Sequence, residues 1–112
     1  MTAVDDWVTR LEADGELTPE GVERIVAAHG DRGQQAIEAV GESRVKRYRD
    51  FVVVVGHKDE YIVEDDGCTC ADAEYNLGPD ELCWHALAVR IAQAIDAVDD
   101  HDMWYSDVRD FL

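Results

Sequence analysis

The chain has 112 residues, which is enough for one domain with a helical extension. Hydrophobic residues make up 46% of it, and this excludes a chain that is disordered throughout. Its 26 acidic residues outnumber its 10 Lys and Arg residues, so the net charge of −16 predicts a strongly anionic surface.

The charge balance indicates an environment rather than a fold. Repulsion among so many carboxylates is tolerable where salt shortens the Debye length, to ~3 Å at about 1 M. An acidic, apolar-rich chain whose lysines are Lys46 and Lys58 alone is therefore typical of a cytoplasm at molar salt, as in halophilic archaea. An acidic protein of a mesophile is the alternative.

The sequence also predicts a compartment. Residues 1–10 contain Asp5 and Asp6 and no apolar stretch, so no signal peptide is expected. The longest apolar run, residues 51–55, is far shorter than the ~18 residues of a membrane span. We expect a cytoplasmic protein with no membrane partner, in which reduced cysteines favour metal binding over disulfides.

Residues 1–42 are predicted to form a helical N-terminal segment of three short helices. Each has apolar residues at helical spacing, so each presents one face to a core. The stripes are Val4, Trp7, Val8 and Leu11, then Val22, Ile25, Val26 and His29, then Ile37 and Val40. The predicted helices end at Gly15, Gly30 and Gly41.

Two of these helices carry start signals. Thr18 precedes Pro19, which pairs a capping hydroxyl with a proline at the first helical position. Asp31 and Gln34 have the spacing of a capping box for the third helix. His29 falls on an apolar stripe and is interpreted as a partly buried histidine rather than a metal ligand.

The predicted secondary structure changes from helix to strand at Arg44. Residues 44–55 are rich in β-branched and aromatic side chains and predict one strand. Residues 56–60 predict a turn, and residues 61–63 predict a second strand, antiparallel to the first. The first cysteines follow in a loop just past this hairpin.

A long buried helix is predicted over residues 83–98, with Asp80 as a candidate cap and with apolar residues on most of its circumference. Cys83 is expected to precede the helix proper, and His85 to lie in its first turn. Residues 43–98 then form the core unit, and residues 99–112 form a short C-terminal helix or tail.

All the cysteines and one histidine lie together in the pattern C-x-C-x12-C-x-H. Three thiolates and one imidazole supply the four ligands that a tetrahedral zinc ion takes in a closed, structural site. We therefore predict one structural Zn²⁺, which stabilises a small core. Its ligands are Cys68, Cys70, Cys83 and His85.

Other uses of these residues are less favoured. One alternative is that the three cysteines are buried and reduced, the histidine lies on the surface, and no metal binds. Another is an iron–sulfur cluster, which generally takes four thiolates. A zinc hydrolase or deaminase needs an open coordination position, which four protein ligands close. We therefore expect no enzyme and no small-molecule substrate.

The metal motif and its flanks resemble the SWIM-type zinc finger. SWIM domains run a strand with an aromatic residue, a Cys-Thr-Cys, and a Cys-x-His followed by a small and apolar helix. The matching segments here are Tyr61-Ile62-Val63, Cys68-Thr69-Cys70 and Cys83-Trp84-His85-Ala86-Leu87-Ala88.

The resemblance covers about residues 45–97 and implies a ββα zinc module that binds DNA or other proteins. SWIM domains appear in transposase-like proteins, chromatin-linked ATPases, ubiquitin-pathway proteins and accessory factors of homologous recombination. Because this chain is too small to include enzymatic partner domains, the resemblance implies an adaptor or accessory role.

A basic cluster at the start of the first strand is a candidate nucleic-acid site. Basic and aromatic side chains alternate there and are able to bind phosphates and stack on bases. The alternative is that the cluster neutralises acids such as Glu42 and those of residues 64–66. At molar salt four bases give little affinity, because counterion release then contributes little. The cluster comprises Arg44, Lys46, Arg47 and Arg49.

The sequence thus predicts an α+β fold: short N-terminal helices, an antiparallel β-hairpin, a zinc knuckle and a long buried C-terminal helix. The expected function is that of a zinc-binding interaction module, a protein-binding adaptor or accessory factor in DNA transactions. The alternative function is direct DNA or RNA binding through residues 44–49.

Overall fold

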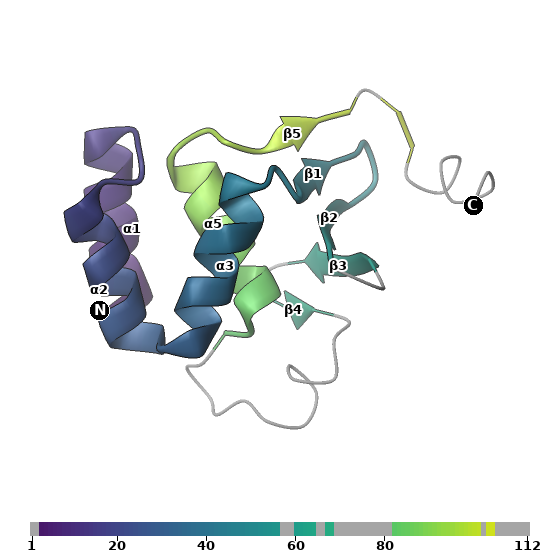
Figure 1. The fold of residues 1–112 in the computed structure, drawn as a ribbon. Coiled ribbons are helices and arrows are strands. Elements are labelled where there is room, and N and C mark those ends of the chain that lie inside the picture. The colour runs from purple at the N-terminus through teal and green to yellow at the C-terminus, as the bar shows by residue number, and fades with distance from the viewer. Residues whose placement is uncertain (1–2, 57–59, 65–66, 69–81, 102, 105–112) are drawn as a thin grey trace.

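In the part of the chain that the structure describes, three helices precede the first strand, and one more lies between the last two strands. The computed structural model describes residues 3–56, 60–64, 67–68, 82–101 and 103–104. The architecture is α+β, as predicted (Figure 1). None of the helices in these ranges is long and apolar enough to cross a bilayer. The elements are α1 (Ala3–Asp14), α2 (Pro19–His29), α3 (Asp31–Gly41), β1 (Val45–Arg47), β2 (Val52–Val55), β3 (Glu60–Glu64), β4 (Gly67–Cys68), α5 (Trp84–Ala94) and β5 (Asp99–Asp100).

One mixed sheet collects the strands in the order β4-β3-β2-β1-β5. The first three pairings are antiparallel, whereas β1 and β5 run parallel. The predicted antiparallel hairpin is confirmed as β2 and β3, in which Val54 lies opposite Tyr61.

The single strand predicted over residues 44–55 is wrong. The chain forms β1, turns where the Tyr48 N–H donates to the Phe51 carbonyl at 2.8 Å, and returns as β2. A continuous strand over this range would extend about 40 Å. Folding it back places Val45 opposite Val54, and both are fully buried.

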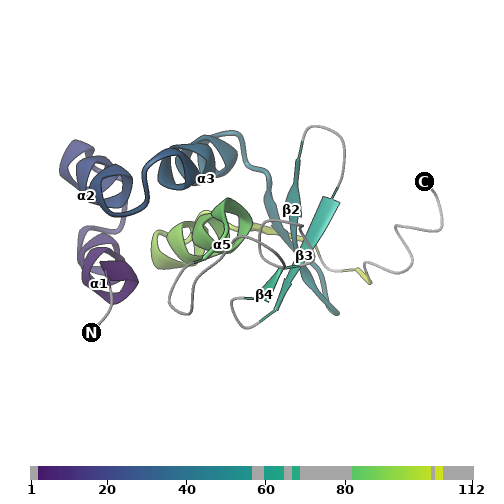
Figure 2. The ribbon, with the colours of Figure 1, turned by 90° about the horizontal axis from the view of Figure 1, so that it is seen from below.

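Helix α5 is the central element. It contacts β1 to β4 as well as α1 and α3, and it lies between the sheet and the N-terminal helices (Figure 2). The predicted burial is confirmed, because the buried residues of α5 are His85, Ala86, Leu87, Ala88, Val89, Ile91 and Ala92.

The end of α5 differs from the prediction of a helix to Val98. The helix stops at Ala94, and Asp96 takes the left-handed conformation with φ of 56°. The chain then leads into β5, so the segment expected to be a helix or tail begins with a strand. Residues 105–112, where most of the predicted terminal helix falls, lie outside the described ranges.

The three N-terminal helices end at the predicted glycines, and α2 begins at its predicted cap. The Thr18 hydroxyl accepts from the Gly21 N–H at 3.1 Å, and Gly30 ends α2 with φ of 61°. The capping box predicted for α3 is wrong, because Gly30, which has no side chain, is its N-cap. Asp31 is instead the first helical residue, where its charge favours the helix N-terminus.

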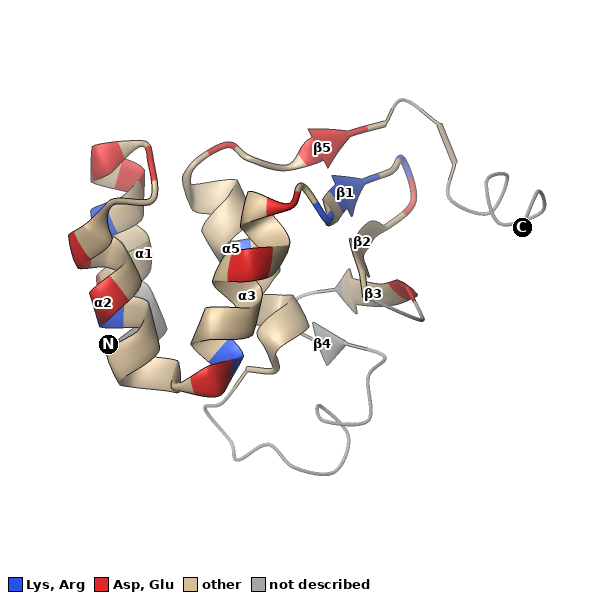
Figure 3. Cartoon of the chain, viewed as in Figure 1, with Lys and Arg blue, Asp and Glu red and all other residues tan. Residues whose placement is uncertain are grey.

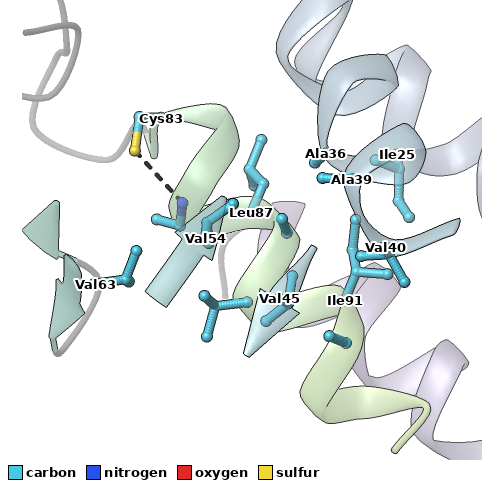
Figure 4. Packing of buried hydrophobic residues seen from close by; sticks show 14 of the residues in the cluster. Ile25, Ala36, Ala39, Val40, Val45, Val54, Val63, Cys83, Leu87 and Ile91 are labelled. Carbon is cyan, nitrogen blue, oxygen red and sulfur yellow. Dashed lines mark hydrogen bonds between the residues drawn. The ribbon is translucent and has the colours of Figure 1, made fainter. Parts of the chain in front are cut away.

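One hydrophobic core joins the helices to the sheet (Figure 4). The N-terminal helices therefore pack into the same core as the strands. Its fully buried side chains include Trp7, Leu11, Ile25, Val45, Val54, Leu87 and Ile91.

Gly33 lies where α3 packs against α2. A Cβ at this position would stand 2.9 Å from the Ile25 carbonyl oxygen and 3.0 Å from its Cγ2. Because backbone atoms cannot move aside freely, Gly33→Ala should lower the free energy of unfolding by about 1–3 kcal/mol.

Gly41→Ala is the matched control, since a Cβ there would meet nothing within 4 Å. It should leave stability unchanged or raise it by up to about 1 kcal/mol, because alanine favours a helix more than glycine. Urea unfolding followed by circular dichroism measures both variants. Equal stability of the two would contradict the close α2–α3 contact.

A hydrogen bond from Trp7 Nε1 to His29 Nε2, 2.9 Å long, joins α1 to α2. Burial lowers the pKa of His29 below its ordinary value of 6.5, and the bond itself needs an unprotonated Nε2. The unfolded chain then binds more protons than the folded one below pH ~6.5. The free energy of unfolding should therefore fall as the pH drops from about 6.5 towards the lower pKa of the folded state.

His29→Gln keeps an acceptor near the indole but does not titrate. Urea unfolding of the wild type and this variant should give free energies that converge as the pH falls below about 6.5. A constant difference between the two across that range would refute this linkage.

Candidate metal centre

The start of α5 holds two of the four predicted ligands. Cys83 is the N-cap, and the helix begins with Trp84, so His85 lies in its first turn, as predicted. The Cys83 sulfur accepts from the Ala86 N–H at 3.4 Å (Figure 4). Cys83 itself therefore takes the capping position, for which Asp80 was the candidate. The helix N-terminus also favours negative charge on this sulfur.

The His85 imidazole is buried between two aromatic rings. The residue is only 3% exposed, and its ring centroid lies 4.1 Å from that of Tyr61 and 3.8 Å from that of Trp84. Within the described part of the chain, neither ring nitrogen has a hydrogen-bond partner. A buried polar group without a partner costs ~1–3 kcal/mol, so the surroundings of this imidazole bear on the stability of the fold.

Of the other two predicted ligands, Cys68 comes just before residues 69–81 and Cys70 is one of them. Cys68 lies in β4, where its Cα is opposite that of Val63 in β3. This corrects the prediction that Cys68 follows the hairpin in a loop, because the chain adds a further short strand first. Cys70 lies outside the described residues, as does the side chain of Cys68.

The fold brings these parts of the sequence together. Helix α5 contacts both β3 and β4, and Val63 and Cys83 belong to the same buried cluster. The start of α5 and the backbone of Cys68 therefore meet at one edge of the sheet. No three potential metal ligands gather among the side chains that the structure describes, a set that includes Cys83 and His85.

The predicted basic cluster is divided between buried and exposed positions. The Arg44 side chain is only 14% exposed, and its guanidinium lies 3.3 Å from Glu42 and 5.7 Å from the centroid of the Trp84 ring. Its Nη1 also donates to the Val55 carbonyl at 3.3 Å. Arg44 therefore packs against the domain rather than presenting its charge to solvent.

The next two bases pair with β5. Its parallel register places Asp99 opposite Lys46 and Asp100 opposite Arg47, and both ion pairs form. The Lys46 ammonium is 3.1 Å from the Asp99 carboxylate. Figure 3 shows the basic strand β1 beside the acidic strand β5. Arg49 is exposed on the turn that follows.

The acids that meet the basic strand were not anticipated. Glu42 was a candidate neighbour, but Asp99 and Asp100 were assigned to a helix or tail. An Asp-Asp pair after a helix is also typical of a loop, so only the charge match to Lys46-Arg47 hints at strand pairing.

His101 forms a second polar cluster with Asp99. Its Nε2 lies 3.0 Å from the carboxylate, and its ring stacks on Tyr48 with centroids 5.1 Å apart. The hydrogen bond from Lys46 to Asp99, and then the one from His101, lower the pKa of this carboxyl. The cluster is thus an ion-pair network in which the Asp99 carboxylate already pairs with Lys46.

Comparison with known proteins identifies one relative. An Archaeoglobus fulgidus protein, described as uncharacterized, is 43% identical over 88 residues, which cover 79% of this chain and 77% of the relative. The match is longer than residues 43–98, so it extends beyond the predicted zinc-binding core. No family model matches the chain. No solved structure matches it either.

Proposed function

The chain belongs to the same family as the Archaeoglobus fulgidus protein, and we propose that it is a zinc-binding interaction module of the SWIM type. One structural Zn²⁺ is held by Cys68, Cys70, Cys83 and His85. The observation that carries this proposal is the buried His85 ring, which has no polar partner in the described part of the chain and lies two residues after Cys83.

The free energies involved favour a bound metal over an empty site. An unpaired buried nitrogen costs ~1–3 kcal/mol, whereas structural zinc contributes ~10–16 kcal/mol in zinc-finger peptides. A Zn–N bond would occupy one ring nitrogen and leave the other to donate to a neighbour. The buried Cys83 sulfur would be the adjacent ligand, and its hydrogen bond from Ala86 N–H would orient it.

The role of this ion is structural rather than catalytic. Four protein ligands leave no position for an activated water or a substrate. The zinc would join β4, the residues just after it and the start of α5, which closes the connection between strand and helix. Such a clip stabilises a small domain because it removes conformational freedom from the unfolded chain.

An adaptor role in DNA transactions is supported better than direct nucleic-acid binding. Of the four bases predicted to bind phosphate, Arg44 is mostly buried, and Lys46 and Arg47 meet carboxylates on β5. Affinity for a polyanion depends on the number of phosphates that a protein neutralises. With a net charge of −16, the rest of the chain opposes that interaction.

The composition supports a cytoplasmic location at high salt. Carboxylates outnumber bases by 26 to 10, so salt would screen the self-repulsion that destabilises such a chain in dilute buffer.

The zinc proposal predicts that one substitution changes the free energy of unfolding in opposite directions with chelator and with zinc. His85→Phe keeps a ring against Tyr61 and Trp84 but removes both nitrogens. In the presence of chelator, the variant should be at least as stable as the wild type, because no unpaired nitrogen remains. In the presence of zinc, the wild type should be more stable by several kcal/mol, because the variant has lost a ligand.

Urea unfolding with zinc and with chelator measures both comparisons, and elemental analysis measures metal content. The wild type should carry one zinc per chain and His85→Phe clearly less, while the control His101→Phe should carry as much as the wild type. Wild-type protein without bound metal would refute the site. So would a His85→Phe variant that carries one zinc per chain and binds zinc as tightly as the wild type.

A second prediction separates the adaptor from the nucleic-acid binder. Fluorescently labelled single-stranded and duplex oligonucleotides should show no change in anisotropy with the zinc-loaded protein. The triple variant Lys46→Ser, Arg47→Ser, Arg49→Ser is the comparison, and it spares the buried Arg44. Binding by the wild type that falls steeply with salt and is lost in the triple variant would instead establish direct nucleic-acid recognition.

A further inference from the structure

An open groove of about 680 Å³ lies between the β1–β2 turn and the outer side of α5. Three arginines line it: Arg47 at the end of β1, Arg49 on the turn and Arg90 on α5. We call it the arginine groove. It draws guanidinium groups from positions far apart in the sequence, and Arg90 was not among the predicted basic residues.

The floor of the arginine groove is apolar. It is formed by Val52 of β2, Val63 of β3 and Val89 of α5, and both Val63 and Val89 are buried. Tyr48 and Phe51 contribute aromatic rings to the lining, and Gln93 contributes an amide. An apolar floor within a basic rim suits a ligand that combines an apolar side chain with negative charges.

The described lining of the groove is mainly basic, whereas the chain as a whole is acidic. Among the lining residues that the structure describes, Asp50 is the one carboxylate, against three guanidinium groups. The chain has only 10 bases in total, so this is a marked local concentration. Arg47 also pairs with Asp100, but both side chains are more than half exposed, and such pairs contribute only ~0–1 kcal/mol. An incoming carboxylate is therefore able to compete for Arg47.

Sheet register connects the groove to the proposed zinc site. One row of paired residues crosses the sheet from Arg47 through Val52 and Val63 to Cys68. Because neighbouring strands lie ~4.8 Å apart, the Cys68 backbone is about 10 Å from that of Val52. The metal that holds Cys68 to the start of α5 would thus also fix the spacing of strands and helix at the groove floor.

We propose that the arginine groove binds an acidic segment of a partner protein. Carboxylates of that segment pair with Arg47, Arg49 and Arg90, and an apolar side chain between them packs on the valine floor. This inference rests on the proposed adaptor function and names the chemistry of its partner. Arginine suits this role because its planar fork binds carboxylates in a bidentate manner.

A peptide fits the groove better than a nucleic acid does. A nucleic acid that extends past the groove towards β5 would meet the carboxylates of Asp99 and Asp100. One face of Tyr48 is already covered by His101, which reduces the surface available for base stacking. Valine side chains at the floor match an aliphatic side chain and offer no stacking surface.

Selection of displayed random peptides on the zinc-loaded full chain tests the proposal. The selected peptides should share at least two Asp or Glu residues flanking an apolar residue. Anisotropy titration of the tightest peptide should then show affinity reduced about tenfold or more by Arg49→Ser and by Arg90→Ser, as expected when one member of a charge pair is removed. The buffer salt is set at a level where circular dichroism shows every variant folded.

Arg24→Ser is the matched control, because Arg24 is an exposed arginine that pairs with Asp6 and Glu20 on the helical side of the molecule. It should bind the peptide as the wild type does. Arg49→Glu is a second test at an exposed turn position, and it should abolish binding.

Three results would overturn the proposal: selected peptides without acidic enrichment, peptide binding that survives Arg49→Glu and Arg90→Ser, or an oligothymidylate of equal charge that binds more tightly at the same arginines. Zinc content of each preparation separates this inference from the proposed function. Full zinc without acidic-peptide binding refutes the groove alone, whereas protein without zinc refutes the metal site on which it depends.

Discussion

The packing of α5 on two sides is the constraint from which the rest of the structure follows. Its small and aliphatic residues face the sheet and the N-terminal helices at once, which makes nearly every position from 85 to 92 buried. Such a helix cannot begin in solvent. Its first turn is buried as well, and the polar groups placed there must be satisfied inside the protein. Cys83 satisfies one backbone donor, and His85 adds an imidazole that has no hydrogen-bond partner among the described residues.

Local signals in the sequence predicted the N-terminal helices well, because capping residues and glycines mark where a helix starts or ends. Thr18 and Pro19 define the start of α2, and the strand character of Val52 and its neighbours follows from β-branching. The turn at residues 48–51 was not predictable in the same way. It has no glycine or proline, and the chain reverses there because Val45 and Val54 gain burial on one face. That gain depends on α5, which lies far along the sequence.

The candidate metal site was predictable in its residue types and only partly in its geometry. Ligand spacing placed Cys83 before the helix and His85 in its first turn, and both positions agree with the structure. Strand β4 was missed because a two-residue strand leaves no periodic pattern to detect. The ion pairs of β1 with β5 were missed for a related reason. Strand pairing between residues 53 positions apart is a property of the assembled sheet, and no local pattern encodes it.

The distribution of charge follows from the same assembly. The parallel register of β5 brings two aspartates to Lys46 and Arg47, which neutralises the part of the basic segment that lies within the sheet. Arg49 and Arg90 lie on the turn and on α5, where they line the groove. A basic run that reads in sequence as one nucleic-acid-binding strip is thus divided by the fold into a structural part and a surface part. The surface part is joined by Arg90, which is distant in sequence, in the groove for which we propose an anionic partner. Val52 and Val63 of its floor belong to the row of paired residues that ends at Cys68, so the proposed recognition at the groove would depend on the order of the proposed metal site.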